Sequence, residues 1–326
     1  MKSKSHIFTI GAILFGAGIF LSHHLTKTML KIAIEREGAQ RLNHAPTLQK
    51  RISGYLPKED FRAAIHRAES KLRALPLQRI EIKAKDGTAL VGHWYPCEKQ
   101  ERIIIAMHGW RSDWAHDFGM IAPFLNQNHC SVLYAEQRGQ GESGGDYMGF
   151  GLTERLDCLS WIQWVNNQIG RAPLYLAGIS MGAATVLMAA GLGLPNNVKG
   201  IIADCGFTSP HAIWKHIAEN HFHLSFRLRG PIADHFCKKA LKIGANAYST
   251  RDALLKSTTP ILLIHGKEDH FVPLEMTLEN YHTCTAPKRL LIIPGADHGM
   301  SYYSATEQYQ KKVLEFFAAF DLFQSY

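Results

Sequence analysis

The feature that most constrains the fold is a succession of short apolar runs, separated by segments long enough to form helices. Strands buried on both faces of a parallel sheet are apolar throughout and are connected through helices. The alternation therefore predicts an α/β fold with a mostly parallel central sheet and helices on both faces. The expected strands are Ile103–Met107, Ser131–Ala135, Leu174–Ala177, Val198–Ala203, Ile261–His265 and Arg289–Ile293.

Two further strands are expected before these runs. Arg79–Lys83 and Ala89–Tyr95 alternate between apolar and polar residues, and Asp86-Gly87 between them favours a tight turn. We therefore expect an antiparallel hairpin at one edge of the sheet.

Residues 207–256 interrupt the alternation, because they contain no strand pattern between two expected strands. Apolar residues recur there at helical spacing, as in Ile232 and Phe236, and an insertion of this length is more plausible as a helical cap than as a loop. Trp214, Phe222 and Phe226 lie in this cap. They are candidates for an apolar substrate pocket, although such side chains equally form the core of a cap.

The segment Gly178-Ile179-Ser180-Met181-Gly182 carries the first chemical signal. It lies between the expected strand Leu174–Ala177 and an alanine-rich helix expected over Met181–Leu192. A serine at a sharp strand-to-helix turn needs small neighbours two residues away on each side, and its hydroxyl is exposed at the positive end of the helix. This context predicts that Ser180 is a nucleophile.

A serine nucleophile needs a base, and the base needs an acid that orients it. Asp269 directly follows the expected strand Ile261–His265, and His298 follows the last expected strand. We predict Asp269 as the orienting acid and His298 as the base. Asp204 is an alternative acid; Glu268 and Asp297 are expected to be solvated, and His265 and His270 to be structural.

A tetrahedral oxyanion requires two preorganised donors, each worth about 3 kcal/mol of the barrier. The backbone N–H of Met181, immediately after the nucleophile, is one candidate. The backbone N–H of Trp110 is the other, since His108-Gly109-Trp110 follows the first parallel strand and Gly109 lets the backbone turn towards the site.

The basic charge of the chain lies in its N-terminal quarter. The 326-residue chain has a formal net charge of +8, and its first 78 residues carry 13 Lys and Arg against 5 Asp and Glu. A nucleic-acid partner is not expected, because the remaining residues are balanced at 23 of each. A basic stretch beside an apolar segment is better suited to an anionic membrane surface.

The apolar run Ile7–Leu21 predicts an uncleaved signal anchor, a single transmembrane helix within residues 1–30. A cleaved signal or an interfacial helix is the alternative. Lys2 and Lys4 favour an N-terminus on the cytoplasmic side, which places the catalytic domain on the extracytoplasmic side of the membrane. The basic residues on the other flank oppose that orientation and leave it open; they are Lys27, Lys31, Arg36 and Arg41.

Residues 31–78 are expected to form a basic juxtamembrane helical segment. Within it, apolar residues at helical spacing predict an amphipathic helix that packs on the following domain or lies on the membrane surface. These residues are Phe61, Ile65, Ala68, Leu72 and Leu75.

Neither a metal nor a cofactor is expected. The six cysteines are widely spaced without a C-x-x-C pair, and the 18 histidines include no H-E-x-x-H motif. We expect free, mostly buried thiols.

Several motifs together resemble the α/β-hydrolase superfamily. They are His108-Gly109, Arg138–Ser143, the serine turn, Asp204–Pro210, His265-Gly266 through Pro273, and Asp297-His298. The similarity spans Arg79–Phe320 and is greatest to the monoglyceride-lipase-like and serine-aminopeptidase-like branch, including membrane-anchored bacterial members. Residues 79–326 are thus expected to form the hydrolase domain. Similar proteins usually have Asp in place of Glu136, a position expected to stabilise a loop.

These observations predict a serine hydrolase that cleaves a carboxylic ester, such as an acyl-glycerol or another small acyl ester, through an acyl-enzyme on Ser180. Peptidase or aminopeptidase, thioesterase and acyltransferase activities use the same three residues and remain open. A non-catalytic binding protein on this fold is a further alternative. The expected partners are a small-molecule acyl substrate and the membrane; the sequence leaves the oligomeric state open.

Overall fold

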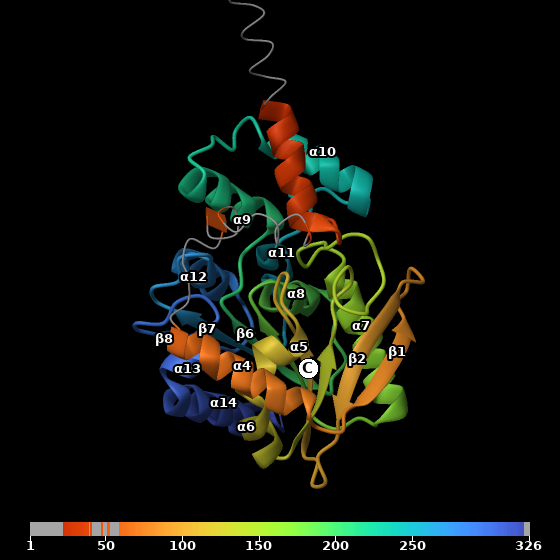
Figure 1. The fold of residues 1–326 in the computed structure, drawn as a ribbon. Helices are drawn as coiled ribbons and strands as arrows, with labels where there is room; N and C mark the ends of the chain where they lie inside the picture. Colours follow the sequence, from red (N-terminus) through yellow and green to blue (C-terminus); the bar gives the residue numbers. More distant parts are fainter. Residues whose placement is uncertain (1–21, 39, 41–46, 48–50, 53–58, 323–326) are drawn as a thin grey trace, which may run out of the picture.

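The computed structural model describes residues 22–38, 40, 47, 51–52 and 59–322. Within them the chain forms one eight-stranded sheet in the order β1-β2-β4-β3-β5-β6-β7-β8 (Figure 1). The strands are β1 (Gln78–Lys83), β2 (Ala89–Tyr95), β3 (Arg102–Met107), β4 (Cys130–Ala135), β5 (Leu174–Ile179), β6 (Val198–Asp204), β7 (Ile261–Gly266) and β8 (Lys288–Ile293). Strand β2 pairs antiparallel with both β1 and β4, and all other pairs are parallel. The mostly parallel sheet with an antiparallel hairpin at its edge is confirmed.

Successive side chains of the parallel strands enter two different cores. In β3, Ile103 and Ile105 pack into the core on one face, whereas Ile104 packs into the core on the other. This follows from the two-residue period of a strand, and it explains why both faces must be apolar. One layer contains α7 (Glu154–Gln168), α8 (Met181–Ala189), α11 (Thr250–Leu254) and α12 (Leu274–Thr283); the other contains α4 (Glu59–Arg73), α5 (Trp114–Phe118), α6 (Ala122–Gln127), α13 (Ser301–Ser304) and α14 (Thr306–Phe320).

A third core belongs to the helical cap, which lies beyond the carboxyl ends of the parallel strands (Figure 1). The cap contains α9 (Pro210–His216), a π-helix (Ile217–His221) and α10 (Gly230–Leu241). Helix α9 begins where it does because Ser209 caps it, accepting the N–H of Ala212 at 3.0 Å. The predicted helical insertion is confirmed, although its last helix, α11, packs on α8 beside the sheet.

Two N-terminal segments pack on this framework. The helix over residues 22–34 lies beside α10 in Figure 1, and its buried Leu30 and Ile34 join the core of the cap. Helix α4 packs against α5, and its Phe61 ring makes an edge contact with Tyr303 at 5.0 Å between centroids. The amphipathic helix was expected either on the catalytic domain or on the membrane surface, and the structure shows it packed on the catalytic domain.

Of the predicted anchor segment, residues 1–30, the apolar run Ile7–Leu21 lies outside the described residues, whereas residues 22–30 belong to the helix that packs on the cap. Among those that are described, no helix is both long and apolar enough to cross a membrane. All six cysteines are free thiols, five of them buried, as expected.

Replacing Phe61 by Ala tests how firmly α4 is held. Phe61 is 4% exposed, so the substitution should leave a cavity and lower the free energy of unfolding by about 3 kcal/mol. Urea denaturation of the full chain measures this change. Ser70→Ala on the exposed face of α4 is the control and should alter stability by less than about 0.5 kcal/mol. Equal stabilities for the two variants would contradict the packing described.

Candidate active site

The turn between β5 and α8 holds Ser180 in a strained backbone conformation. Its φ of 55° and ψ of −114° are unfavourable for a residue with a side chain. The turn is possible because Gly178 and Gly182 approach each other: a Cβ on Gly178 would overlap the backbone of Gly182, and one on Gly182 would overlap the carbonyl oxygen of Met107. This is the geometry expected of a serine nucleophile at a strand-to-helix turn.

Ser180, His298 and Asp269 form one hydrogen-bonded chain. The Oγ of Ser180 lies 2.9 Å from Nε2 of His298, and Nδ1 of His298 lies 2.8 Å from Oδ2 of Asp269. The other oxygen of Asp269 accepts the backbone N–H groups of Phe271 at 2.9 Å and Val272 at 2.8 Å. The structure thus brings together the three residues that the sequence placed in this order.

His265 supports Asp269 from behind. Its Nε2 lies 3.3 Å from Oδ2 of Asp269 and 2.9 Å from the carbonyl oxygen of Val272, so this nitrogen carries the hydrogen. Its Nδ1 faces the hydroxyl of Thr277 at 2.7 Å. Burial would raise the pKa of Asp269, but the charge of His298 and the hydrogen bonds from His265 and His298 hold this pKa below its usual value. Asp269 therefore stays ionised.

The ionised carboxylate controls His298 in turn. Burial lowers the pKa of His298, yet the attraction of Asp269 outweighs this effect and raises the pKa well above 6.5. The imidazole is 25% exposed, and the ring of Phe271 packs edge-on against it with 4.9 Å between centroids. His298 is therefore a strengthened base that reaches both Ser180 and the solvent-accessible cleft.

The remaining acidic residues have other partners. Asp204 is buried and accepts the hydroxyl hydrogen of Ser301 at 2.8 Å, and burial raises its pKa to about 6. Glu268 is exposed, as expected. The expectation that Asp297 is solvated is wrong: it is 8% exposed and accepts the backbone N–H groups of His270 and His298, which hold two loops together.

The 108–111 loop, which follows β3, lies beside the serine. A Cβ on Gly109 would be 3.4 Å from Cβ of Ser180. The N–H of Gly109 donates to Asp117 at 2.6 Å, and the N–H of Arg111 donates to the side-chain oxygen of Gln140 at 2.6 Å. The peptide of Trp110, the predicted donor, is therefore fixed on both sides. Met181, the other predicted donor, is the first residue of α8.

His108 connects this loop to α8. The N–H of Gln137 donates to Nε2 of His108 at 3.1 Å, so Nδ1 carries the hydrogen and donates to the carbonyl oxygen of Gly109 at 2.9 Å. The side-chain oxygen of Gln137 accepts the hydroxyl hydrogen of Thr185 in α8 at 3.0 Å. The loop and the nucleophile turn are thus held by one buried polar network.

Ser180 and His298 open into a cleft of about 580 Å³, one wall of which is helix α4. The three aromatic residues proposed for the substrate pocket line a separate apolar cavity of about 90 Å³, together with the helix over residues 22–34. Trp214, Phe222 and Phe226 therefore come together, but in a cavity distinct from the cleft of Ser180. Trp110 lines both spaces, and its ring stacks on Phe271 with 6.4 Å between centroids.

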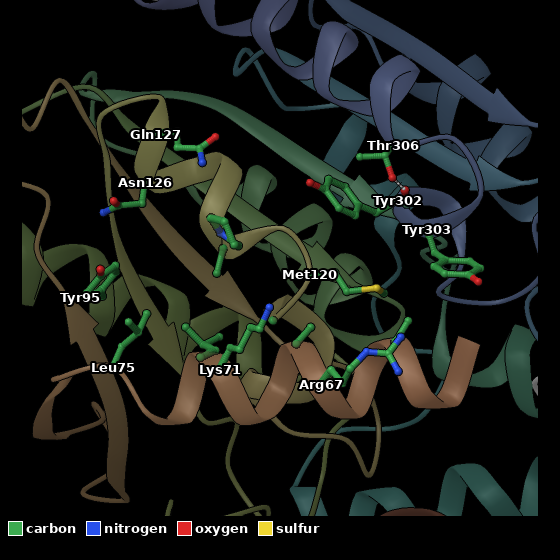
Figure 2. A pocket seen from close by; sticks show the side chains of 16 residues that line it. Arg67, Lys71, Leu75, Tyr95, Met120, Asn126, Gln127, Tyr302, Tyr303 and Thr306 are labelled. Atoms are coloured by element: carbon green, nitrogen blue, oxygen red, sulfur yellow. Dashed lines mark hydrogen bonds between the residues drawn. The ribbon is translucent and has the colours of Figure 1, made fainter. Parts of the chain in front are cut away.

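A larger groove of about 650 Å³ lies on the other side of α4 (Figure 2). Its walls come from α4, α6 and the region of α13, and Met120 lines both this groove and the cleft of Ser180. None of the three residues of the Ser180 chain lines it.

One group of possible metal ligands among the described residues overlaps the same site. Ligand atoms of Cys205, Asp269 and His298 lie within 4.8 Å of one another. Burial raises the pKa of the Cys205 thiol to about 11, so it stays protonated and binds metals poorly. The carboxylate and imidazole are already engaged with each other and with Ser180.

The expected role of Glu136 in a loop agrees with its contacts. One carboxylate oxygen lies 2.8 Å from Nε2 of His93, and the other accepts the backbone N–H of Glu142. Its own carbonyl oxygen accepts the hydroxyl hydrogen of Ser143 at 2.7 Å. The longer Glu side chain thus closes the loop over residues 136–143.

The sequence did not reveal several residues that shape the site. Asp117 and Gln140 fix the 108–111 loop, and helix α4 forms a wall of the cleft. None has a spacing relation to Ser180 that a pattern along the chain detects, since each meets the site only through tertiary contacts.

The fold and this site define an α/β-hydrolase. Solved structures of such enzymes align with the chain, and at these identities the likeness shows the fold alone. The esterase Pf2001 of Pyrococcus furiosus has a TM-score of 0.61 and 22% identity, with 77% of this chain and 93% of that chain covered. The ferulic-acid complex of Est1E from Butyrivibrio proteoclasticus has a TM-score of 0.59 and 22% identity, with 73% and 99% covered.

Sequence relatives narrow the class to a family. Residues 116–320 match the prolyl oligopeptidase family, and YqkD of Bacillus subtilis is 30% identical over 229 residues, which are 69% of this chain and 73% of that protein. The chain belongs to the prolyl oligopeptidase family and is a hydrolase. The lysophosphatidylserine lipase ABHD12 of Danio rerio is 25% identical over 221 residues, 64% of this chain and 53% of that protein. The superfamily is thus confirmed, whereas assignment to the monoglyceride-lipase-like branch stays a prediction.

Replacing Asp269 by Asn should lower the pKa of His298. The neutral amide no longer stabilises the imidazolium, while burial continues to disfavour it. NMR titration of the chain with ¹³C-labelled histidine measures this pKa, and the His298→Asn variant identifies the signal.

Glu268→Gln is the matched control for this titration. It removes the same charge from the neighbouring exposed position and should shift the pKa of His298 far less. Similar shifts in the two variants would show that Asp269 does not control His298.

Proposed function

We propose that the protein is a serine hydrolase that cleaves a carboxylic ester through an acyl-enzyme on Ser180. The observation that carries the proposal is the hydrogen-bonded chain from Ser180 Oγ through His298 to Asp269, at 2.9 Å and 2.8 Å. A base within this distance can take the serine proton, and a buried carboxylate holds the base in the required tautomer.

The reaction follows from these positions. His298 takes the hydroxyl proton through Nε2 as Ser180 attacks the ester carbonyl, and the N–H groups of Trp110 and Met181 stabilise the oxyanion. His298 then gives the proton to the leaving alcohol. A water molecule attacks the acyl-enzyme with His298 again as base, which frees the carboxylic acid and restores Ser180.

An acyl ester with an apolar acyl group is the favoured substrate class, acyl-glycerol-like or another small ester. The cavity around Trp214, Phe222 and Phe226 adjoins the cleft, because Trp110 lines both spaces, and it offers an apolar surface close to Ser180. The names of several similar proteins, an esterase and a lysophosphatidylserine lipase among them, agree with ester chemistry.

Peptide hydrolysis is the second candidate, and the name of the prolyl oligopeptidase family favours it. The same three residues would serve a peptidase or aminopeptidase, and they would equally serve a thioesterase or an acyltransferase. A non-catalytic binding role is disfavoured, because it gives no reason for the strained backbone of Ser180.

We further propose that the N-terminal segment anchors the enzyme to a membrane through a single span over Ile7–Leu21, with the rest of residues 1–78 near the membrane surface. The apolar run Ile7–Leu21 and the basic excess of the first 78 residues support this location, which would bring lipid-like esters within reach.

A fluorophosphonate probe tests the nucleophile. The wild-type chain should be labelled at Ser180, and Ser180→Ala should abolish the labelling. The variant Ser301→Ala, which changes another buried hydroxyl, should still be labelled. Undiminished labelling of Ser180→Ala would remove Ser180 from the mechanism.

A substrate panel separates ester from amide hydrolysis. The full chain should hydrolyse p-nitrophenyl esters of graded chain length at least 100-fold faster in kcat/KM than aminoacyl anilides. The full chain is needed because α4 and the helix over residues 22–34 contact the site. Preferential cleavage of anilides would establish the peptidase alternative instead.

The pH dependence should follow His298. Because only the neutral imidazole accepts the serine proton and its pKa is raised, kcat/KM should increase with pH through a midpoint above 6.5. Asp269→Asn should lower kcat by about 10⁴-fold, since the amide fails to hold the tautomer. Asp204→Asn should lower it much less; the reverse order would move the acid to Asp204.

A further inference from the structure

The N-terminal helix over residues 22–34 reaches the active site through the 108–111 loop. The indole N–H of Trp110 donates to the carbonyl oxygen of Ala33 at 2.7 Å. The guanidinium of Arg111 donates to the carbonyl oxygens of Ile32 and, at 2.8 Å, of Glu35. Two consecutive side chains of the loop are therefore bound to the last turn of one helix.

Arg111 is well suited to hold this end of a helix. The carbonyl oxygens of the last turn lack partners within the helix, and a cation placed there also interacts favourably with the helix dipole. Burial lowers the pKa of Arg111 to about 10, so the guanidinium remains charged at neutral pH. It also lies over the ring of Trp110, 5.3 Å from the centroid, which joins the two contacts into one unit.

The backbone of Arg111 is held in a demanding conformation. Its φ of 51° lies in the left-handed region, which residues with a Cβ adopt only at a cost. The hydrogen bond from its N–H to Gln140 and the hydrogen bonds of its side chain to the helix both maintain this geometry. The conformation sets the direction of the chain immediately after the Trp110 peptide.

The segment after the helix is fixed on its opposite side. The N–H of Met148 donates to the carbonyl oxygen of Ile34 at 2.7 Å, and the N–H of Arg36 donates to that of Asp146 at 2.8 Å. Gly38 packs against the guanidinium, since a Cβ there would lie 2.5 Å from Nη2 of Arg111. The helix end is therefore a fixed support for the 108–111 loop.

We propose that Arg111 is a positioning residue that, by binding the C-terminal carbonyls of the helix over residues 22–34, holds the Trp110 N–H in place for the oxyanion. The N-terminal segment, which lies outside the family match, then contributes to catalysis without touching the substrate. The inference rests on the proposed serine-hydrolase function. It also places the predicted membrane segment directly before a helix on which the active site depends.

The test compares variants of the full chain on the best p-nitrophenyl ester. Arg111→Ala should lower kcat about 10- to 100-fold with KM changed less than threefold, because a displaced donor affects the transition state more than the bound ester. The inhibition constant of an alkyl trifluoromethyl ketone, which forms a tetrahedral oxyanion on serine, should rise by a similar factor. Arg111→Lys should restore part of kcat and part of the ketone affinity. Its ammonium group can reach a carbonyl oxygen, but it lacks the planar fork of the guanidinium that binds two of them.

Gly38→Ala tests the same contact without altering the loop. Its Cβ would lie 2.5 Å from Nη2 of Arg111 and 2.7 Å from the carbonyl oxygens of Lys31 and Ile32, so it would separate the guanidinium from the helix end. The value of kcat should therefore fall and ketone inhibition should weaken, as in the Arg111 variants. If Arg111→Ala fails to fold, Gly38→Ala and Arg111→Lys still test the positioning role of Arg111.

Arg155→Ala is the matched control. Arg155 is another partly buried arginine that donates to a backbone carbonyl oxygen, that of Leu152, and its guanidinium lies 4.3 Å from the ring centroid of Tyr248. It does not line the cleft of Ser180, so its loss should leave kcat and ketone inhibition unchanged.

Three results would overturn the inference. The first is equal kcat values for the Arg111, Gly38 and Arg155 variants. The second is a rise in KM alone in the Arg111 variants, and the third is a fall in their kcat with ketone inhibition unchanged. A wild-type chain that neither hydrolyses esters nor reacts with a fluorophosphonate would instead contradict the proposed function, and the two failures are thereby distinguished.

Discussion

The close approach of backbone at the turn between β5 and α8 is the constraint on which the site depends. Gly182 lies against the carbonyl oxygen of Met107, the last residue of β3, where any side chain would overlap it. This contact places the start of α8 next to the 108–111 loop, and it allows Ser180 its left-handed backbone. This one backbone contact therefore sets the distance between the nucleophile turn and the loop that carries Trp110, one of the two proposed oxyanion donors.

Electrostatics supplies the second constraint. The carboxylate of Asp269 is buried, yet both of its oxygens have hydrogen-bond partners. One oxygen accepts two backbone N–H groups, and the other faces the imidazoles of His298 and His265. Hydrogen bonds of this kind offset the cost of burying a charge, so the carboxylate remains ionised and raises the pKa of His298. His265 belongs to this arrangement although it does not touch the serine, which explains why a buried histidine lies there.

The N-terminal segments change the picture of an isolated hydrolase domain. The match to the prolyl oligopeptidase family covers residues 116–320. Outside that range, however, α4 forms a wall of the cleft, and the helix over residues 22–34 supports the 108–111 loop. The boundary near residue 79 that the sequence suggests is thus a boundary of family resemblance. Tertiary contacts cross it in one helical layer, through α4, and in the cap, through the helix over residues 22–34.

The sequence by itself determined the strands, the cap and the order of Ser180, Asp269 and His298, because strand periodicity and the turn glycines are local properties of the chain. Only the tertiary structure decided that Trp214, Phe222 and Phe226 lie in a cavity apart from Ser180, and that Asp297 is buried. It also decided that Arg111 meets a helix about 80 positions earlier in the sequence. Contacts over such separations depend on how the layers pack, which no spacing along the chain encodes.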